Sequence, residues 1–582
     1  MTVSSPEWST RTFGNEDRLP RVPVPALEDS GRRFLEWCAP LLTPEELAAT
    51  ETAVAEFLAP GSPAHELQAA LEEYDRAPGV HSWLDTFWPY RYLGRRDRIA
   101  LNANFFFLFQ DSPLGQVERA AELTASAVDY KLKLDEELVP PVLLRGTPQS
   151  MVQHKYLFSA TRIPGGLLDT ARTRFPSPER HIVVFSKGTP FRMDVLAEDG
   201  RPYSAEQIAD GLRAILKDDH GTDVPAGHFT TKARAEWAAS RAALLEAGNA
   251  DALETIETAL FCLCLDDFTP SNALEAGDRL LYGDNRWYDK AVSLVVFEDG
   301  TAGINVEHCE LDGTTILGFT DALLSGSRHE REPADGVPGY EIVEFTLTDA
   351  LREDARAAGA SFKAYADATA THTVSFGFGA NRAKELGMSP DAFAQMAYQL
   401  AHRRAKGLTG ATYESIATRQ FRNGRTEAMR VVTPEVFRFV DTVESATASA
   451  DEKRSAFRGA AAKHVSRAKE CQAGDAPEQH LWELQLIAKR HGDATDLSLY
   501  SSPGWLKMRD DYLSTSSAPS VNIQYFGFGS TSPQCIGIAY VLLPDRWNIY
   551  LSTPKHVSAE MYRFADELAK AVSELQELLA GA

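Results

Sequence analysis

A histidine followed four positions later by an acid and a glycine is the combination in this sequence best suited to acid–base chemistry. His308 and Asp312-Gly313 lie in the stretch "TAGINVEHCELDGTTI", residues 301–316. An imidazole titrates near neutral pH, so a histidine at the end of a strand can serve as a general base. Asp312, in a turn that ends in glycine, can fold back and orient the loop. An ordinary polar turn would contain the same residues, so the motif indicates a catalytic site only with further support.

Two other interpretations of the histidine and cysteine residues are weaker. Cys309 directly follows His308, and neighbouring residues of an extended segment point to opposite faces, so a Cys–His nucleophile pair is not expected. Cys262 and Cys264 lack a second ligand pair at zinc spacing, and the sequence has no His-Glu-x-x-His motif. We therefore predict no metal site and expect these two cysteines in a strand of the core.

Other common catalytic and nucleotide-binding signatures are absent. The sequence contains no G-x-S-x-G motif and no G-x-x-x-x-G-K-[ST] motif. "GFGANR", residues 377–382, begins like a dinucleotide fingerprint but has Arg382 where the third glycine belongs. A glycine-rich turn is the better interpretation of that segment.

A predicted hairpin positions the histidine. Residues 290–308 contain two apolar runs joined by Glu298-Asp299-Gly300, and Asp-Gly is a strong turn signal. The second strand then runs from about Ala302 to Glu307, which leaves His308 at its exit.

Further along the chain, helices and strands alternate. Residues 388–407 predict a helix that Ser389 caps, Pro390 begins and Gly407 ends. Residues 446–475 predict a surface helix and loop, and an amphipathic helix closes the chain from about Ser558. The polar, Pro/Gly-rich residues 323–341 are a candidate crossing between domains. The predicted fold class is mixed α/β.

The composition excludes several classes of function. The chain has 582 residues and a formal net charge of −23, which argues against general nucleic-acid binding and requires a local basic patch for any anionic ligand. No apolar run approaches the roughly 20 residues of a spanning helix, and the first residues lack a signal core, so we predict no membrane association and a cytoplasmic location. The six cysteines are expected as buried free thiols.

Longer blocks of sequence accompany the histidine motif. They are "GDNRWYDKAVSLVVFEDGTAGINVEHCELDG", "MSPDAFAQMAYQLAHRRAKGLTGATYESIATRQFRNGRTEAMR" and "YLSTSS", in this order, with "LPRVPVPAL" near the start. Together they resemble the choline/carnitine O-acyltransferase family from about Leu19 to the final helix. The resemblance implies two domains similar to chloramphenicol acetyltransferase, each a mixed sheet flanked by helices, with an active-site tunnel at their interface. We assign residues 15–90 to an N-terminal helical segment packing on the C-terminal domain, 91–350 to the histidine domain and 351–582 to the coenzyme A domain.

The resemblance also implies a reaction. Acyl-CoA and an acceptor alcohol would meet at His308, which would deprotonate the hydroxyl for direct attack on the thioester in a ternary complex. Asp312 would orient or electrostatically support the histidine; a turn cap is the alternative. "STS", residues 514–516, places Ser516 where the family has a serine that hydrogen-bonds the tetrahedral oxyanion. Removal of such a donor raises the barrier by roughly 3 kcal/mol.

The coenzyme A side is less complete. Before the helix at residues 388–407 the family has two lysines for the phosphates; Lys384 matches one, Ala380 replaces the other, and Arg382 can substitute. Ser389 and Asp391 complete the predicted coenzyme A site, with Asp391 at the place of a residue near the adenine. The alternative for Lys384 is a solvated surface lysine.

The acceptor side departs most from the family pattern. Tyr413 and Thr426 match a tyrosine and a threonine that hold the carboxylate of carnitine, but Gln479 stands where carnitine enzymes have an arginine before a His-Leu pair. Asn102 aligns with a second tyrosine, and Ser514 completes the predicted acceptor site. A neutral glutamine cannot neutralise a buried carboxylate, and choline enzymes change the threonine that is kept here. These residues suit a neutral, hydroxyl-rich acceptor.

The leading hypothesis is an acyl-CoA-dependent O-acyltransferase, a monomer that binds acyl-CoA and a small non-carnitine alcohol and has no tightly bound cofactor. Gln524, two residues before the "FG" of "IQYFGFG", replaces a residue of the acyl pocket where glycine admits long chains, so a short acyl group is predicted. The alternatives are a carnitine O-acetyltransferase with a rebuilt carboxylate site, a choline-type acceptor, and a degenerate acyl-CoA-binding protein. An acyl-carrier-protein donor would need a basic patch, for which Lys384, Arg403 and Arg404 are candidates.

Overall fold

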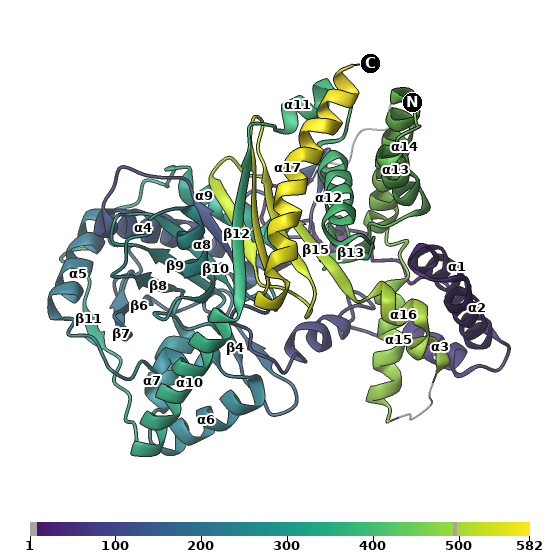
Figure 1. Cartoon of the computed structure of the whole chain (residues 1–582). Coiled ribbons are helices and arrows are strands. Elements are labelled where there is room, and N and C mark those ends of the chain that lie inside the picture. The colour runs from purple at the N-terminus through teal and green to yellow at the C-terminus, as the bar shows by residue number, and fades with distance from the viewer. Residues whose placement is uncertain (1–7, 493–496, 582) are drawn as a thin grey trace, which may run out of the picture. The chain divides into compact units, whose positions relative to one another are not determined.

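The computed structural model describes residues 8–492 and 497–581 and divides them into two compact units (Figure 1). Unit 1 contains the chain up to Leu19, Trp88–Thr369 and Ser520–Gly529; unit 2 contains Pro20–Phe87, Ala370–Pro519 and the chain from Ser530 onward. Each unit has its own multistranded sheet and helices. The predicted mixed α/β class, with two sheets flanked by helices, is confirmed.

The sheet of unit 1 has eight strands. Their order is β11 (Tyr340–Ile342), β7 (Thr189–Asp194), β6 (His181–Ser186), β8 (Cys262–Leu265), β9 (Val292–Val296), β10 (Ala302–Val306), β1 (Phe105–Phe109) and β16 (Ile523–Phe528). Strand β8 runs parallel to both of its neighbours, and the other pairs are antiparallel. Two short hairpins complete the strands of this unit, β2 (Leu143–Leu144) with β3 (Thr147–Pro148) and β4 (Thr161–Ile163) with β5 (Thr170–Arg172).

Seven α-helices belong to the described part of unit 1: α4 (Gln116–Asp135), α5 (Ala205–Asp218), α6 (Arg234–Glu246), α7 (Ala250–Thr258), α8 (Ala273–Tyr282), α9 (Gly313–Leu324) and α10 (Asp349–Asp367). Helix α4 packs on β8 and β9, and α8 packs on β1, β10 and β16. The strands β1, β8, β9 and β10 are buried along their whole length, which explains why they read as continuous apolar runs.

The predicted hairpin before the histidine is confirmed. Strands β9 and β10 pair antiparallel from Val296–Ala302 to Val292–Val306. Gly300 has φ of +87°, the left-handed conformation for which glycine is the favoured residue. His308 follows two residues after the end of β10, as the sequence predicts.

Strand β16 is the least expected member of this sheet. The sequence order places "VNIQYFGFG" among the strands of the predicted domain 351–582, yet β16 pairs antiparallel with β1 at the edge of the unit 1 sheet. The chain enters unit 1 at Ser520 and leaves it after Gly529. Gln524 therefore belongs to the same unit as His308.

The sheet of unit 2 has six strands. Their order is β12 (Thr369–Phe376), β18 (Trp547–Pro554), β17 (Ile536–Leu542), β15 (Asp511–Ser517), β13 (Ala411–Ala417) and β14 (Thr426–Arg430). The central strand β15 is parallel to both β13 and β17. Helices α12 (Pro390–Lys406) and α17 (Ser558–Ala580) lie side by side over one face of this sheet (Figure 1).

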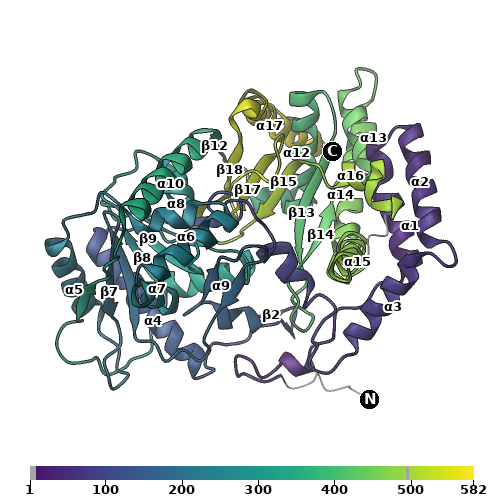
Figure 2. The ribbon, with the colours of Figure 1, turned by 90° about the horizontal axis from the view of Figure 1, so that it is seen from below.

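The other helices of unit 2 are α1 (Leu27–Cys38), α2 (Pro44–Leu58), α3 (Pro63–Asp75), α11 (Ala380–Glu385), α13 (Pro434–Glu444), α14 (Ala450–Gln472), α15 (Glu478–Arg490) and α16 (Pro503–Met508). The N-terminal helices α1 to α3, in purple, lie beside α15 and α16 (Figure 2). A fully buried hydrogen-bond chain fixes this contact, since His480 of α15 bonds Ser30 of α1 at 2.7 Å and Gln68 of α3 at 2.8 Å.

Local signals predicted the helix ends well. Ser389 accepts a hydrogen bond from the Ala392 amide, Pro390 is the first residue of α12, and Gly407 ends the helix with φ of 70°. The closing helix begins at Ser558 as expected. Helix α14 is more than a surface helix, because it buries Phe457, His464 and Arg467.

The compact units do not follow the predicted boundaries at 90/91 and 350/351, and that domain assignment stays a prediction. Residues 323–341 lie wholly inside unit 1, so they are not the crossing from one unit to the other. Within residues 8–492 and 497–581, no helix combines the length and the apolar character needed to span a bilayer.

Candidate active site

The predicted site residues are divided between the two units. His308, Asp312, Asn102 and Gln524 belong to unit 1, and the predicted coenzyme A, oxyanion and remaining acceptor residues belong to unit 2. Each group is described within its own unit.

The imidazole of His308 is held in one tautomer. Its Nδ1 lies 2.8 Å from the carbonyl oxygen of Leu311, which only accepts hydrogen bonds, so Nδ1 carries the proton and Nε2 the lone pair. The rings of Tyr92 and Phe105 pack on the imidazole, with centroids 4.9 and 5.1 Å away. The side chain is 30% exposed. This is the arrangement that a general base at a strand exit requires.

Asp312 is buried beside the histidine and is held by a residue that the sequence did not reveal. Its Oδ1 lies 3.7 Å from Nδ1 of His308. Its Oδ2 accepts a hydrogen bond from Nε2 of Gln153 at 2.7 Å, and its amide donates to Oε1 of Gln153 at 2.9 Å. Thr315 also donates to Oε1 of Gln153, at 2.8 Å. Gln153 thus fixes both the carboxylate and the first turn of α9, and the side chain of Asp312 makes no cap hydrogen bond to that helix.

Cys309 faces the core, as the alternation of the chain predicts. It is buried, and burial together with the neighbouring Glu307 carboxylate raises the pKa of its thiol well above the usual value. Cys262 and Cys264 are likewise fully buried in β8. A protonated, buried thiol is a poor nucleophile, so Cys309 is not a partner for the histidine.

The hydroxyl residues predicted in unit 2 share one face of its sheet. Thr515 accepts a hydrogen bond from Gln395 of α12 at 2.9 Å, so its side chain points to the helices. Successive residues of a strand alternate between faces, so Ser514 and Ser516 lie on the opposite face. Tyr413 pairs with Ser514 across β13 and β15, and paired residues point the same way.

The same alternation extends to β14. Thr426 pairs with Ala417, four residues beyond Tyr413 on β13, and therefore lies on the face of Tyr413. Gln479 of α15 is buried, and its Nε2 donates to the carbonyl oxygen of Thr426 at 3.0 Å. Four predicted residues, Tyr413, Thr426, Ser514 and Ser516, thus share a face, with Gln479 at its β14 edge.

The arginine on this face is already engaged with carboxylates. Arg430 pairs with Tyr413 in the sheet and binds Glu478, the neighbour of Gln479, through two hydrogen bonds of 2.6 and 2.7 Å. It also binds Asp511 at 2.5 Å. A new anion would have to compete with both carboxylates for this guanidinium.

The predicted phosphate-binding side chains lie on the short helix α11. Lys384 is exposed, while Arg382 pairs with Glu385 at 3.1 Å and bonds Gln576 at 3.4 Å. The Arg382–Glu385 pair is solvent-exposed, and such pairs contribute less than about 1 kcal/mol, so a phosphate can displace it. Ser389 is the cap of α12.

Asp391 lies in the one group of described residues whose ligand atoms are close enough to hold a metal ion, together with Glu414 and His464. Nε2 of His464 donates to Asp391 at 3.1 Å and lies 3.3 Å from Glu414, and Tyr540 also donates to Asp391. Burial and the Asp391 carboxylate raise the pKa of Glu414 well above its usual value. Hydrogen bonds to Asp391 connect His464 and Tyr540 in this cluster, and the absence of a metal site stays a prediction.

Asn102 and Gln524 make contacts of their own in unit 1. Asn102 accepts a hydrogen bond from Tyr365 at 2.9 Å. Gln524 donates to the carbonyl oxygen of Phe109 at 2.8 Å and to Asp111 at 3.1 Å. Their roles with acceptor and acyl group stay predictions.

Comparisons with known proteins agree with a site for acyl transfer to an alcohol. The family model described as "Choline/Carnitine o-acyltransferase" matches residues 22–570. The chain therefore belongs to the choline/carnitine O-acyltransferase family, and it is a CoA-dependent O-acyltransferase of the carnitine/choline type.

Individual relatives cover nearly the whole chain. Carnitine O-palmitoyltransferase 2, mitochondrial, of Mus musculus is 31% identical over 583 residues, which cover 92% of this chain and 88% of that protein. Carnitine O-acetyltransferase of Homo sapiens is 29% identical over 598 residues, covering 98% and 95%. Among solved structures, TRI3 trichothecene 15-O-acetyltransferase from Fusarium sporotrichioides matches with 11% identity and a TM-score of 0.40 over 82% of this chain and 92% of that one, a likeness too low to carry an argument.

Proposed function

We propose that the protein transfers a short acyl group from coenzyme A to the hydroxyl of a small neutral acceptor other than carnitine. His308 Nε2 removes the proton of the acceptor hydroxyl, whose oxygen attacks the thioester carbonyl directly. The tetrahedral oxyanion accepts a hydrogen bond from Ser516, and collapse of the intermediate releases the coenzyme A thiolate, which takes up a proton. Asp312, fixed by Gln153, supports the charge of the imidazolium. Lys384, Arg382, Ser389 and Asp391 bind coenzyme A.

The nature of the acceptor rests on one observation, the buried amide of Gln479 at the place where the resemblance puts a carboxylate-binding arginine. The face beside it carries the neutral groups of Tyr413, Thr426, Ser514 and Ser516, and Arg430 already binds two carboxylates. A substrate carboxylate desolvated here would lack a partner of its own, and a lost charge pair costs several kcal/mol.

A second candidate is a carnitine O-acetyltransferase, which the names of the relatives favour. Release of free thiol from acetyl-CoA separates the two, measured with carnitine, with choline and with a panel of neutral alcohols. Saturable activity with carnitine at micromolar to low-millimolar KM would overturn the proposal. An acceptor screen by mass spectrometry with acyl-CoAs of increasing length then names the acceptor and tests the role of Gln524.

The carrier-protein alternative lacks the expected support. Arg403 pairs with Asp441 at 3.1 Å, and Arg404 pairs with Glu444 and Glu574 at 2.7 and 2.8 Å. These arginines therefore do not provide the basic patch that an acidic carrier would need, and coenzyme A is the proposed donor.

A further inference from the structure

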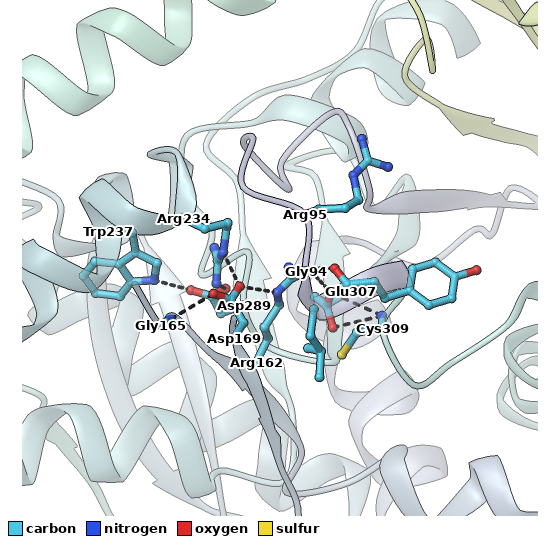
Figure 3. Close-up of polar contacts among 12 residues, drawn as sticks. Gly94, Arg95, Arg162, Gly165, Asp169, Arg234, Trp237, Asp289, Glu307 and Cys309 are labelled. Atoms are coloured by element: carbon cyan, nitrogen blue, oxygen red, sulfur yellow. Dashed lines mark hydrogen bonds and ion pairs between the residues drawn. The ribbon is translucent and has the colours of Figure 1, made fainter. Parts of the chain in front are cut away.

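A buried ionic network leads from helix α6 to the turn that carries the histidine (Figure 3). Two arginines and three carboxylates form it, and each is at most 2% exposed: Arg162, Arg234, Asp169, Asp289 and Glu307. Trp237 donates to Asp289, Arg234 joins Asp289 to Asp169, and Arg162 joins Asp169 to Glu307. Asp169 is also paired with Arg96, so three arginines meet at this carboxylate.

Glu307 ends this network at the residue before the histidine. Its carboxylate accepts from Nη1 of Arg162 at 3.1 Å and, with both oxygens, from the amide of Cys309 at 3.2 Å. His308 is the residue between Glu307 and Cys309. The direction of its side chain is therefore set by a turn that Arg162 holds through the Glu307 carboxylate.

The same guanidinium has a second contact with the surroundings of His308. Nη2 of Arg162 donates to the carbonyl oxygen of Tyr92 at 2.9 Å, and the ring of Tyr92 packs on the imidazole at 4.9 Å. A planar guanidinium can make these bonds in fixed directions at once, which a lysine ammonium cannot reproduce. One side chain thus fixes both the turn that carries the imidazole and the ring that packs against it.

We propose that Arg162 is a positioning residue that sets the imidazole of His308 through Glu307 and Tyr92. The inference rests on the proposed role of His308 as the base. It assigns to Arg162 a part in the reaction although this arginine is buried and binds other groups of the protein.

Arg234 provides a matched control. It is equally buried and donates to the same oxygen of Asp169, at 2.6 Å like Arg162, but its second carboxylate is Asp289 instead of Glu307. Substitution of either arginine by lysine keeps the charge and disturbs two buried ion pairs. A merely structural role therefore predicts the same behaviour for R162K and R234K.

The experiment compares both variants with the full-length wild type. The ring signals of His308 in [15N]histidine-labelled protein, assigned by their loss in H308Q, are followed through a pH titration. We expect R162K to shift these signals and R234K to leave them in place, although both variants lower the denaturant midpoint. With the acceptor identified, kcat of R162K falls about 10- to 100-fold with little change in KM for acyl-CoA, while R234K stays within about twofold of wild type.

A second pair of variants covers the case in which R162K does not fold. E307Q keeps an acceptor oxygen for Arg162 and the Cys309 amide but removes the charge. D289N removes the charge at the other end of the network and leaves one acceptor oxygen for Arg234 and Trp237. E307Q weakens the bonds of this side chain to Arg162 and to the Cys309 amide, so we expect it to shift the ring signals of His308 and to lower kcat as R162K does. D289N leaves both unchanged.

The outcomes separate this inference from the proposed function. Equal effects of the matched variants on the His308 signals, or no effect of R162K and E307Q, overturn the positioning role even when the wild type transfers acyl groups. A selective effect on the signals in a protein that transfers no acyl group supports the positioning role and overturns the proposed function.

Discussion

The histidine turn of unit 1 and the serine–threonine strand of unit 2 are both held from behind by buried side chains, but with different chemistry. Behind His308 lie full charges, the ion pairs of Arg162, Asp169 and Glu307. Behind β15 lie neutral groups, where Gln395 donates to Thr515 at 2.9 Å and to Tyr540 at 3.2 Å. Gln399 holds Thr412 of β13 in the same way, at 2.9 Å.

The difference fits the roles that we propose for the two segments. A base that becomes an imidazolium gains from nearby carboxylates and tolerates a charged support. A strand whose hydroxyls stabilise an oxyanion needs donors in fixed directions without a charge that would bind other anions, and neutral amides supply them. A buried charge left without its partner is strongly destabilising, whereas a neutral hydrogen bond contributes only about 1 kcal/mol. Substitutions in the ionic network should therefore lower the free energy of unfolding more than substitutions of the neutral amides.

The largest expected effect concerns the base itself. H308Q should lower kcat by about 10²- to 10⁴-fold, because the acceptor hydroxyl loses its proton acceptor. The denaturant midpoint should stay near that of the wild type, since the side chain is 30% exposed and outside the ionic network. Thiol release and a denaturation curve check both points, and full activity in H308Q would rule out general-base catalysis by this residue.

The second-largest effect should come from the buried ionic network behind His308. D169A leaves Arg162 and Arg234 buried without their shared carboxylate and should lower the free energy of unfolding by about 3–5 kcal/mol. Urea denaturation measures this loss, and D199A, at an exposed carboxylate, is the control. A loss below about 1 kcal/mol in D169A would show that the network does not behave as a buried one.

In strand β15 of unit 2, S516A should raise the activation free energy of acyl transfer by about 3 kcal/mol, because the oxyanion loses a hydrogen-bond donor. This corresponds to a fall of about 10²- to 10³-fold in kcat. Ser517 on the same strand is exposed, and S517A should keep the wild-type rate. Equal rates for S516A and wild type would remove Ser516 from the proposed mechanism.

The stability contributed by the buried ionic network should also depend on pH. Burial raises the pKa of Asp289 from 3.8 to about 6, although Arg234 and Trp237 work in the opposite direction. The folded protein therefore binds this proton more tightly than the unfolded chain, and the contribution of Asp289 to stability falls as pH rises from about 4 to about 6, by about 3 kcal/mol in total.

D289N should remove that dependence, and its unfolding free energy should become less sensitive to pH between about 4 and 6. Chemical denaturation at closely spaced pH values checks this, with D199N as the exposed control. An unchanged pH profile in D289N would contradict the raised pKa.

The smallest effect should come from the two neutral glutamines of α12 that bind threonines of the sheet, Gln395 and Gln399. Q395L and Q399L each remove an amide that binds a strand threonine and should each lower stability by about 1 kcal/mol. Only Q395L should also lower kcat, because Thr515 lies between Ser514 and Ser516. Equal kcat values for Q395L and Q399L would show that the hydrogen bond from Gln395 to Thr515 has no influence on the reaction.

Turn, helix-capping and strand-alternation signals in the sequence correctly predicted several elements of the fold. The Asp-Gly turn placed His308 at the end of β10, and Ser389, Pro390 and Gly407 gave the ends of α12. The alternation of an extended segment predicted that Cys309 faces the core. Each of these depends on residues within one turn or one strand.

The supports of the site escaped prediction because their partners are distant in sequence. Gln153 lies 159 residues before Asp312, and Arg162 lies 145 residues before Glu307. Helix α14 was expected at the surface because its composition is polar, but Arg467 is buried and pairs with Glu36, and His464 is buried and pairs with Asp391. Periodicity and turn chemistry do not identify such pairs, since the sequence records each side chain but not its neighbours.

The pairing of β16 with β1 has a consequence for the synthesis of the chain. Phe105–Phe109, "FFFLF", is a fully buried strand whose outer neighbour is made only when translation reaches residues 523–528. Until then β1 presents an unpaired apolar edge, the kind of edge that templates aggregation. Expression of a fragment that ends before Ser520 should therefore yield insoluble protein, and a chaperone that shields this edge should raise the yield of the whole chain.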